Sequence, residues 1–232
     1  MTDALDLQVK ETLFRFLEGD ICLSDFENWI YGSEQLKVLI GEDLYLELVS
    51  VDFRRETARY ESERTIFSVI GRNEFIEWRL CRLMNRIIAR PADVRADILL
   101  AYRLYCRGYR FLAKIGMTYG INVACPLPMN DEWEGLSEPQ KDSIISGFYP
   151  AIIPDAQRIL RALKNRQIIF SNSDDTSLLH GFPDKPDYLD NRTLSEQKKT
   201  AYRSFDMNKP LTKFVFNVFG IRILSYGPLD RL

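Results

Sequence analysis

Apolar residues recur at helical spacing through much of the chain, and a glycine or proline follows most of the runs. In the segment 4–18, Leu5, Val9 and Leu13 stand four residues apart, and Gly19 follows the run. Because residues three or four apart share one face of an α-helix, this spacing predicts an amphipathic helix that ends at the glycine. A series of such segments limits the fold to helices packed through their apolar faces.

Start and stop signals place further helices along the chain. Ser24 with Glu27 matches a capping box, Ser33 and Asn73 are plausible N-caps, and Ser137 with Gln140 forms a second capping-box match. The predicted helices after the first run from Ser24 to Gly32 and over 34–40, 42–53, 56–70, 73–89, 92–115, 137–147 and 155–164.

Two of these segments are ambiguous or interrupted. The segment 42–53 also alternates as a strand would, and we favour a helix because its neighbours are helical. Gly108 interrupts the segment 92–115 at some cost to helix stability.

The pattern changes in the last third of the chain. Residues 167–171 resemble a short strand, and 172–192 is a polar segment expected to form a surface loop. Residues 213–218 and 221–226 are β-branched and aromatic, and predict a hairpin or two successive strands. The expected fold is mainly α with a small C-terminal β element (α+β).

Glycines and prolines also suggest how the chain is organised. The expected parts are a helical region 1–119, a connection 120–135 and a smaller α+β region 136–232 packed with the first. The sequence leaves open whether these parts form one domain or two.

Charge is distributed unevenly along this chain. The formal net charge is only −2, yet residues 1–53 carry a net −9 and residues 54–116 a net +7. A split of this size indicates either a contact with a charged partner or pairing of the two segments with each other.

The acidic segment interleaves carboxylates with aromatic rings, which suits a surface that recognises a basic protein. Charges steer such an encounter, and rings that become buried slow dissociation. The residues of this predicted binding surface are Glu27, Trp29, Tyr31, Glu34, Glu42, Asp43, Tyr45 and Glu47. The alternative is that the rings belong to the core and the carboxylates merely face water.

The basic segment carries two predicted helical stripes that could bind phosphates. The stripes are Arg79, Arg82, Arg86 and Arg90, and Arg103, Arg107, Arg110 and Lys114. The whole chain is slightly acidic, with a pI of about 5.6, so we favour a solvated face or pairing with the acidic segment over nucleic-acid binding.

Catalytic motifs are missing from the sequence, which contains no GxSxG, HExxH or glycine-rich phosphate loop. The single histidine, His180, stands in the polar segment, where a surface role is favoured over a general base. Asp174 with Asp175 and Glu42 with Asp43 are acidic pairs that could serve acid–base or metal chemistry, but we favour solvated or helix-capping groups. Cys106 and Cys125 are interpreted as structural thiols, with Cys106 buried on its helix. We predict a non-enzyme that needs no cofactor.

Neither a metal site nor a membrane-spanning segment is expected. The four cysteines contain no CxxC pair, which argues against a zinc site and for thiols in a reducing cytosol. The sequence lacks both a secretory signal and an apolar run long enough for a membrane helix, so a soluble cytoplasmic protein is expected.

The segment 13–53 resembles a recurrent N-terminal pattern in immunity proteins of bacterial polymorphic-toxin and contact-dependent inhibition systems. The residues that carry the resemblance are Phe26, Glu27, Trp29, Tyr31, Leu36, Gly41, Leu44, Tyr45, Leu48, Asp52 and Phe53. The resemblance implies a cytoplasmic protein that neutralises one cognate toxin by stoichiometric binding. Such toxin domains are often basic nucleases, which an acidic surface would complement.

Three hypotheses therefore stand. The first is an immunity protein with a basic toxin domain as partner, and the second is a nucleic-acid-associated protein that uses the arginine stripes. The third is an enzyme of unfamiliar type that uses His180 or the pair Asp174 and Asp175.

Overall fold

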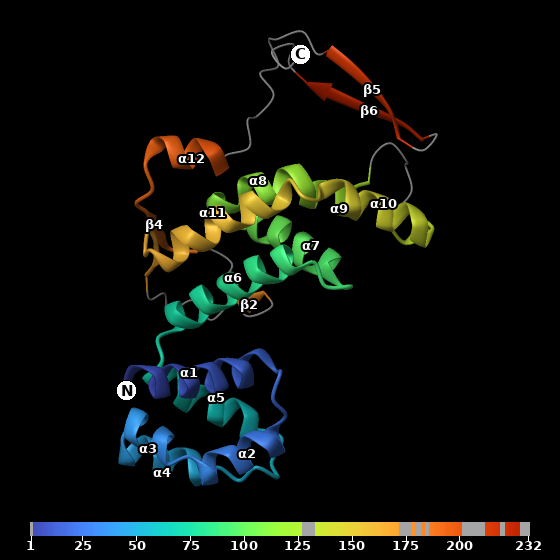
Figure 1. Ribbon diagram of the computed structural model, residues 1–232. Coiled ribbons are helices and arrows are strands. Elements are labelled where there is room, and N and C mark those ends of the chain that lie inside the picture. The colour runs from blue at the N-terminus through green and yellow to red at the C-terminus, as the bar shows by residue number, and fades with distance from the viewer. Residues whose placement is uncertain are drawn as a thin grey trace. The chain divides into compact units, whose positions relative to one another are not determined.

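Helices dominate the computed structural model, and short strands lie toward its C-terminal end (Figure 1), which confirms the mainly α fold with a small β element. The structure describes residues 2–126, 133–171, 178–179, 182–183, 186–200, 212–218 and 221–227, with the backbone alone at 2–6, 178–179, 212–218 and 221–227. None of the described helices has the length and apolar character that crossing a bilayer requires.

The chain divides into two units. Unit 1 comprises residues 1–79 and 170–183, and unit 2 comprises residues 80–169 and 184–232. The division after Arg79 falls within a helix, and the segment 120–135 lies inside unit 2.

Unit 1 consists of helices with one short pair of strands. Its elements are α1 (Thr2–Glu18), α2 (Leu23–Gly32), α3 (Glu34–Ile40), α4 (Glu42–Val49), α5 (Ala58–Val69), the first part of α6 (Arg72–Ala89), and the antiparallel strands β2 (Leu178–Leu179) and β3 (Phe182–Pro183). The helix expected over 42–53 is confirmed at Glu42–Val49 and ends four residues before the predicted limit.

The core of unit 1 forms where the predicted apolar faces of its helices meet. The rings of Phe16 on α1 and Phe26 on α2 stack with their centroids 3.6 Å apart. Leu36 on α3 and Leu48 on α4 are buried in the same cluster. Each such side chain contributes about 1.5–3 kcal/mol when buried, so these contacts fix α2, α3 and α4 against α1.

Local capping signals are partly confirmed. Ser33 caps α3 as predicted, because its Oγ accepts a hydrogen bond from the backbone N–H of Leu36 at 3.2 Å. The Ser24 prediction is wrong: Cys22 is the N-cap of α2, and its Sγ accepts from the backbone N–H of Asp25. The Asn73 prediction is also wrong, because α6 begins one residue earlier.

Unit 2 is built around α7 and α11. Its elements are the rest of α6, α7 (Val94–Cys106), the 3₁₀-helix η1 (Arg110–Leu112), α8 (Ala113–Ile115), the π-helical turn η2 (Gly116–Gly120), α9 (Ile121–Ala124), the 3₁₀-helix η3 (Trp133–Gly135), α10 (Glu138–Phe148), α11 (Ile152–Lys164), β1 (Ile168–Phe170, which ends beyond the division), β4 (Tyr188–Asp190), α12 (Leu194–Thr200), β5 (Thr212–Val218) and β6 (Ile221–Gly227). The capping box of Ser137 and Gln140 is confirmed at the start of α10. Strand β1 pairs with β4, and β5 pairs with β6 in antiparallel fashion, as the hairpin alternative expects. The expectation of a surface loop over 172–192 is wrong, because β2, β3 and β4 lie in this segment and Phe182 is buried.

The single helix predicted over 92–115 is wrong. Helix α7 ends at Cys106 because Gly108 adopts φ +111°, a left-handed conformation that breaks the helical path. The chain then continues through η1, α8 and η2. In η2, Gly116 and Gly120 pass so close to α7 that a Cβ atom at Gly120 would lie 2.6 Å from Cβ of Tyr102.

Candidate protein-binding surface

The predicted acidic surface lies in unit 1 on three consecutive short helices, α2, α3 and α4. Ser33 separates α2 from α3, and Gly41 separates α3 from α4. Gly41 has φ +85° and ψ 162°, a region open almost only to glycine, and this conformation lets α4 begin directly after α3 ends. The three helices therefore follow one another directly in unit 1, and together they carry the residues of the predicted surface.

The three aromatic rings of this surface differ in burial. Trp29 is half-buried and stacks on Phe26, with 5.7 Å between the ring centroids. Tyr45 is half-buried against the core, and its hydroxyl donates to the backbone carbonyl of Ile30 at 3.3 Å. Tyr31 is 57% exposed, and its hydroxyl donates to the carbonyl of Val49 at 3.4 Å. Tyr31 is therefore available to a partner, whereas Trp29 and Tyr45 mainly pack against the core of unit 1.

Three carboxylates of the surface have no partner among the described residues. Glu34 and Asp43 are exposed, and no cation or hydrogen-bond donor contacts either of them in the part of the chain that the structure describes. Glu27 is half-buried on α2, and the described residues give its carboxylate no partner either.

The other two carboxylates have partners within unit 1. Glu42 accepts a hydrogen bond from Lys37 Nζ at 2.7 Å, and this bond lowers the pKa of Glu42 and raises that of Lys37. Glu47 accepts from the hydroxyl of Thr65 at 2.8 Å and lies 3.7 Å from a guanidinium nitrogen of Arg64. Both ion pairs are exposed, so they constrain the surface only weakly.

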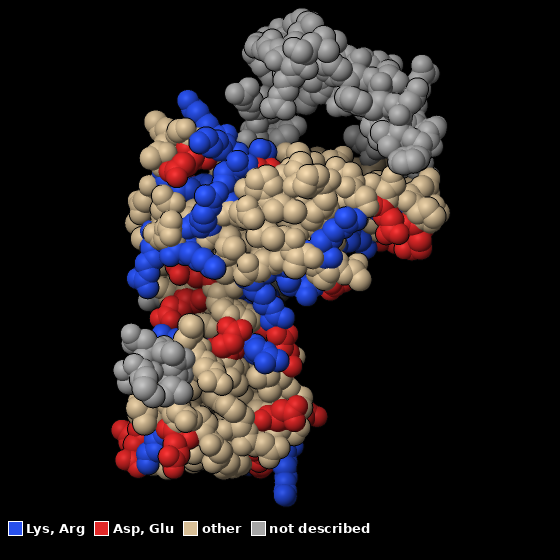
Figure 2. Space-filling view, in the orientation of Figure 1, with Lys and Arg blue, Asp and Glu red and all other residues tan. Residues whose placement is uncertain are grey.

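Exposed aliphatic side chains lie among these acids, and sequence reasoning missed them. Val38 on α3 is 84% exposed, and Leu46 on α4 is 52% exposed. The signal was available, because Val38 stands two residues from Leu36, and a step of two residues points to the opposite side of a helix. Figure 2 shows red carboxylates beside tan surface over this part of unit 1. Apolar anchors surrounded by unpaired acids are the chemistry of a protein-docking surface.

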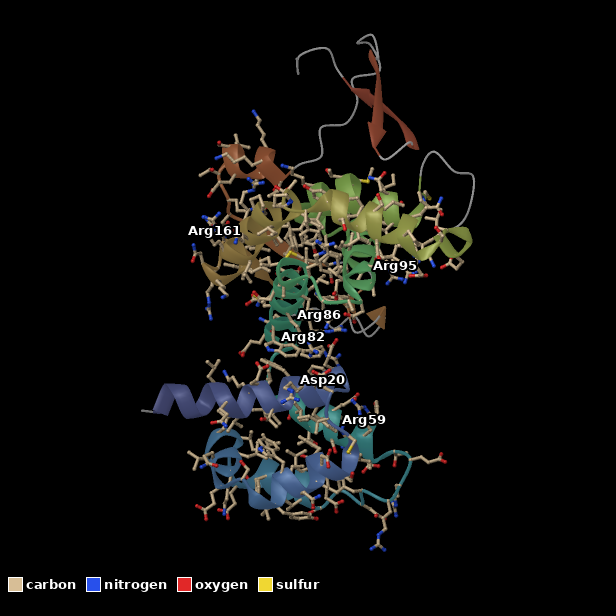
Figure 3. The ribbon with its side chains drawn as sticks, turned by 45° about the vertical axis from the view of Figure 1, so that its right-hand side comes forward. Asp20, Arg59, Arg82, Arg86, Arg95 and Arg161 are labelled. Carbon is tan, nitrogen blue, oxygen red and sulfur yellow. The ribbon has the colours of Figure 1, made fainter. Side chains whose placement is uncertain are left out.

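Two arginines of the first stripe pair with carboxylates of the unit to which each belongs. In unit 1, Arg79 pairs with Glu18. In unit 2, Arg86 donates to both carboxylate oxygens of Asp97 at 3.0 Å. Figure 3 shows Arg82 and Arg86 along α6. Burial raises the pKa of Asp97, and the charges of Arg86 and Arg82 oppose that rise.

The second stripe does not exist as one helical face. Arg103 and Arg107 belong to α7 and its end, whereas Arg110 and Lys114 follow the break at Gly108. Lys114 Nζ lies 3.0 Å from the buried carboxylate of Asp155, which also pairs with Arg158 and accepts from the hydroxyl of Tyr119. This cluster stabilises a buried charge.

The candidate residues for catalysis give no assembled site. His180, Asp174 and Asp175 lie outside the described residues. Cys106 is exposed at the end of α7, so the prediction that it is buried is wrong, and Cys125 is exposed too. Within the described part of the chain, no three metal-ligating side chains form a cluster.

The surface described above supplies the chemical basis for a functional assignment. It combines Tyr31, Val38 and Leu46 as apolar contacts with Glu34 and Asp43 as unpaired charges. Comparison of the chain with protein-family models, with curated proteins and with solved structures finds no match.

Proposed function

We propose that this protein is a cytoplasmic immunity protein that neutralises a cognate toxin by direct stoichiometric binding through α2, α3 and α4 of unit 1. The observation that carries the proposal is the exposure of Tyr31, Val38 and Leu46 beside the unpaired carboxylates of Glu34 and Asp43. The resemblance of the segment 13–53 to immunity proteins supports the same assignment.

The partner is a basic protein domain, and a nuclease toxin has that character. Unpaired carboxylates attract a cationic surface over a distance and accelerate association, as rim charges do in other complexes. The exposed ring and the two aliphatic side chains become buried in the complex and slow its dissociation. Binding of this kind requires no cofactor.

The test is co-expression of the protein with the product of each neighbouring gene, followed by isolation of the complex and measurement of its stoichiometry. We expect one neighbour to be a toxin that forms a one-to-one complex and loses its activity when equimolar protein is present. Absence of a tight complex with every neighbouring gene product contradicts the proposal.

Variants then locate the binding surface. Tyr31→Ala and Leu46→Ala each remove an exposed apolar contact, and each is expected to weaken toxin binding by about tenfold or more. Tyr60→Ala is the matched control, because Tyr60 is 69% exposed on α5 of the same unit and lies outside the three helices. Equal losses in all three variants would exclude this surface as the binding site.

A further inference from the structure

A second charged surface, which the sequence stripes did not predict, lies on unit 2. Its exposed cations come from α11, from the residues just after it and from α12. The cations of this surface are Arg161, Lys164, Arg166, Lys198 and Lys199. Figure 2 shows blue side chains gathered over α11 and α12, and Figure 3 shows Arg161 at the outer side of α11.

The amphipathic pattern of α11 directs its cations outward. Ile152, Ala156, Ile159 and Leu163 are buried on one side of this helix. Arg161 and Lys164 are exposed on the opposite side and stand three residues apart, so their side chains are neighbours on the helix surface. The helices α11 and α12 pack against each other, which brings the lysines of α12 onto the same part of unit 2.

Most cations of this surface have no carboxylate partner among the described residues. In the part of the chain that the structure describes, Arg161, Lys164, Arg166 and Lys198 form no ion pair. Two acids of this region are already engaged, since Asp155 is buried with Lys114 and Arg158, and Asp190 pairs with Arg192.

Glu196 is the acid that stands nearest in sequence to the two lysines of α12. Its carboxylate caps α12 by accepting from the backbone N–H of Thr193 at 2.9 Å and from its hydroxyl at 2.8 Å. These hydrogen bonds are the main causes of the lowered pKa of Glu196, and the charge of Lys199 ranks after them. The surface therefore keeps an excess of positive charge.

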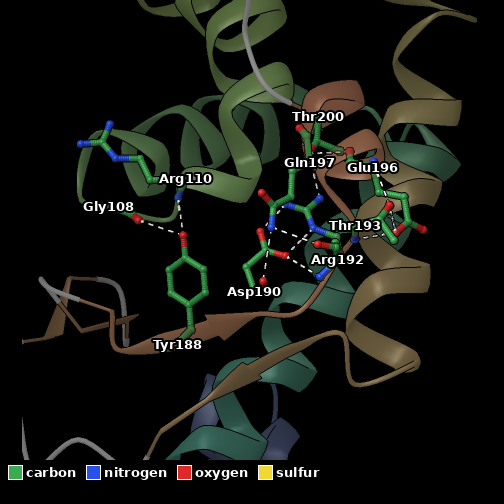
Figure 4. Close-up of polar contacts among 9 residues, drawn as sticks. All are labelled: Gly108, Arg110, Tyr188, Asp190, Arg192, Thr193, Glu196, Gln197 and Thr200. Atoms are coloured by element: carbon green, nitrogen blue, oxygen red, sulfur yellow. Dashed lines mark hydrogen bonds and ion pairs between the residues drawn. The ribbon is translucent and has the colours of Figure 1, made fainter.

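A buried polar network fixes α12 in position (Figure 4). Arg192 is buried and donates to both carboxylate oxygens of Asp190, at 2.8 and 2.6 Å, and to the hydroxyl of Thr200 at 2.8 Å. Gln197 donates to the backbone carbonyls of Asp190 and Arg192. These contacts join Gln197 and Thr200 of α12 to Asp190 of β4 and to Arg192, which follows it, so Lys198 and Lys199 extend from a preorganised support.

We propose that the cations of α11 and α12 bind the phosphate backbone of double-stranded nucleic acid without reading its sequence. Lysine and arginine side chains on a fixed surface neutralise phosphates and release their counterions. Single strands are held by stacking on exposed rings, and every described ring of unit 2 is buried or half-buried. A duplex, which offers its backbone rather than its bases, is therefore the ligand that fits. This binding goes beyond the proposed function and uses a different unit.

The test measures fluorescence anisotropy with a labelled 20-base-pair DNA duplex, an RNA duplex of the same length and a single-stranded RNA, from low to physiological salt. We expect both duplexes to bind more tightly than the single strand and the affinity to fall linearly on logarithmic axes as salt rises. If one duplex type binds and the other does not, the surface is assigned to that duplex.

Variants assign the binding to this surface. The triple variant Arg161→Gln/Lys164→Gln/Lys198→Gln is expected to lose about tenfold or more in affinity and to reduce the salt slope by about 2–3. The control Arg54→Gln/Arg55→Gln/Arg64→Gln removes the same charge from exposed positions of unit 1 and is expected to keep the wild-type slope. Circular dichroism checks that both variants are folded.

Three results would overturn the proposal, and none of them depends on the toxin. The first is no duplex binding by the wild-type protein at low salt. The second is an equal loss of affinity in the triple variant and its control. The third is binding of polyglutamate as tight as that of the duplex, which would assign the surface to acidic proteins.

Discussion

Arg79 donates a hydrogen bond from Nη2 to Oε1 of Glu18 at 3.1 Å, which joins α6 to α1 within unit 1. The side chain of Arg79 is only 10% exposed, and its guanidinium lies over the rings of Phe75 and Phe182. The acidic N-terminal segment is thus paired with the basic segment at this position. On α3 and α4, the carboxylates of Glu34 and Asp43 stay exposed and have no partner among the described residues.

Loss of the Glu18 charge is expected to destabilise the protein. In Glu18→Gln the buried guanidinium of Arg79 loses its compensating charge, and we expect the free energy of unfolding to fall by about 2 kcal/mol. The control Glu74→Gln disrupts the exposed pair with Lys10, 3.4 Å apart, and is expected to change stability by less than about 0.5 kcal/mol. Urea unfolding measures both, and equal effects would refute a special role for Glu18.

Replacement of Gly41, between α3 and α4, is expected to destabilise the protein. An added Cβ at Gly41 meets nothing within 4 Å, so the effect of Gly41→Ala comes from the backbone alone, at φ +85° and ψ 162°. We expect a loss of about 1–3 kcal/mol. Gly147→Ala is the control, because Gly147 lies within α10 and also has open space, and it is expected to be neutral or slightly stabilising. Thermal unfolding compares the two.

Gly120→Ala tests the close packing of η2 on α7. The new Cβ would lie 2.6 Å from Cβ of Tyr102 and 3.0 Å from the carbonyl oxygen of Ile98, and neither atom can move without its helix. We expect a loss of about 2–3 kcal/mol. Gly32→Ala, at the end of α2 with no atom within 4 Å, is expected to change stability by less than about 0.5 kcal/mol. A stable Gly120→Ala variant would show that η2 packs differently.

Glu196 gives stability a defined dependence on pH. Hydrogen bonds from Thr193 lower the pKa of Glu196 below its usual value of 4.5. Because the folded-state pKa is lowered, the stabilisation is present above pH 4.5 and is lost as the pH falls through the folded-state pKa. We therefore expect the Tm of Glu196→Gln to lie below that of the wild type at neutral pH and the gap to narrow as the pH falls below 4.5.

The control for this pH dependence is Asp142→Asn on α10. Asp142 is exposed, and the described residues give its carboxylate no hydrogen-bond donor. Its Tm difference from the wild type is expected to stay small at every pH. A gap for Glu196→Gln that stays unchanged as the pH falls well below 4.5 would contradict a role for its ionised carboxylate.

The proposed toxin complex is expected to separate charge effects from contact effects. Charge reversal in Glu34→Lys/Asp43→Lys is expected to slow association about tenfold or more at low salt, with a smaller effect at high salt. Leu46→Ala is expected to act mainly on the dissociation rate. Surface plasmon resonance at two salt concentrations resolves the two rates. A charge reversal that leaves association unchanged would exclude electrostatic steering by α3 and α4.

Much of the helical structure could be predicted because it depends on local patterns. The apolar spacing of 4–18, the cap at Ser33 and the capping box at Ser137 act within one or two helical turns, and the structure confirms each. The break at Gly108 was underestimated, since a glycine inside a helical pattern does not show whether it takes a left-handed conformation. That choice depends on what the following segment packs against.

The candidate surfaces show the same division between local and tertiary information. The sequence by itself determined that acids and rings would be interleaved along α2, α3 and α4, and that 155–164 would be helical. Only the tertiary structure decided that Tyr31 and Leu46 are exposed while Trp29 packs on Phe26, and that Arg79 is buried against Glu18. Burial and charge pairing depend on residues far apart in the chain, and helical periodicity carries no information about which of them meet.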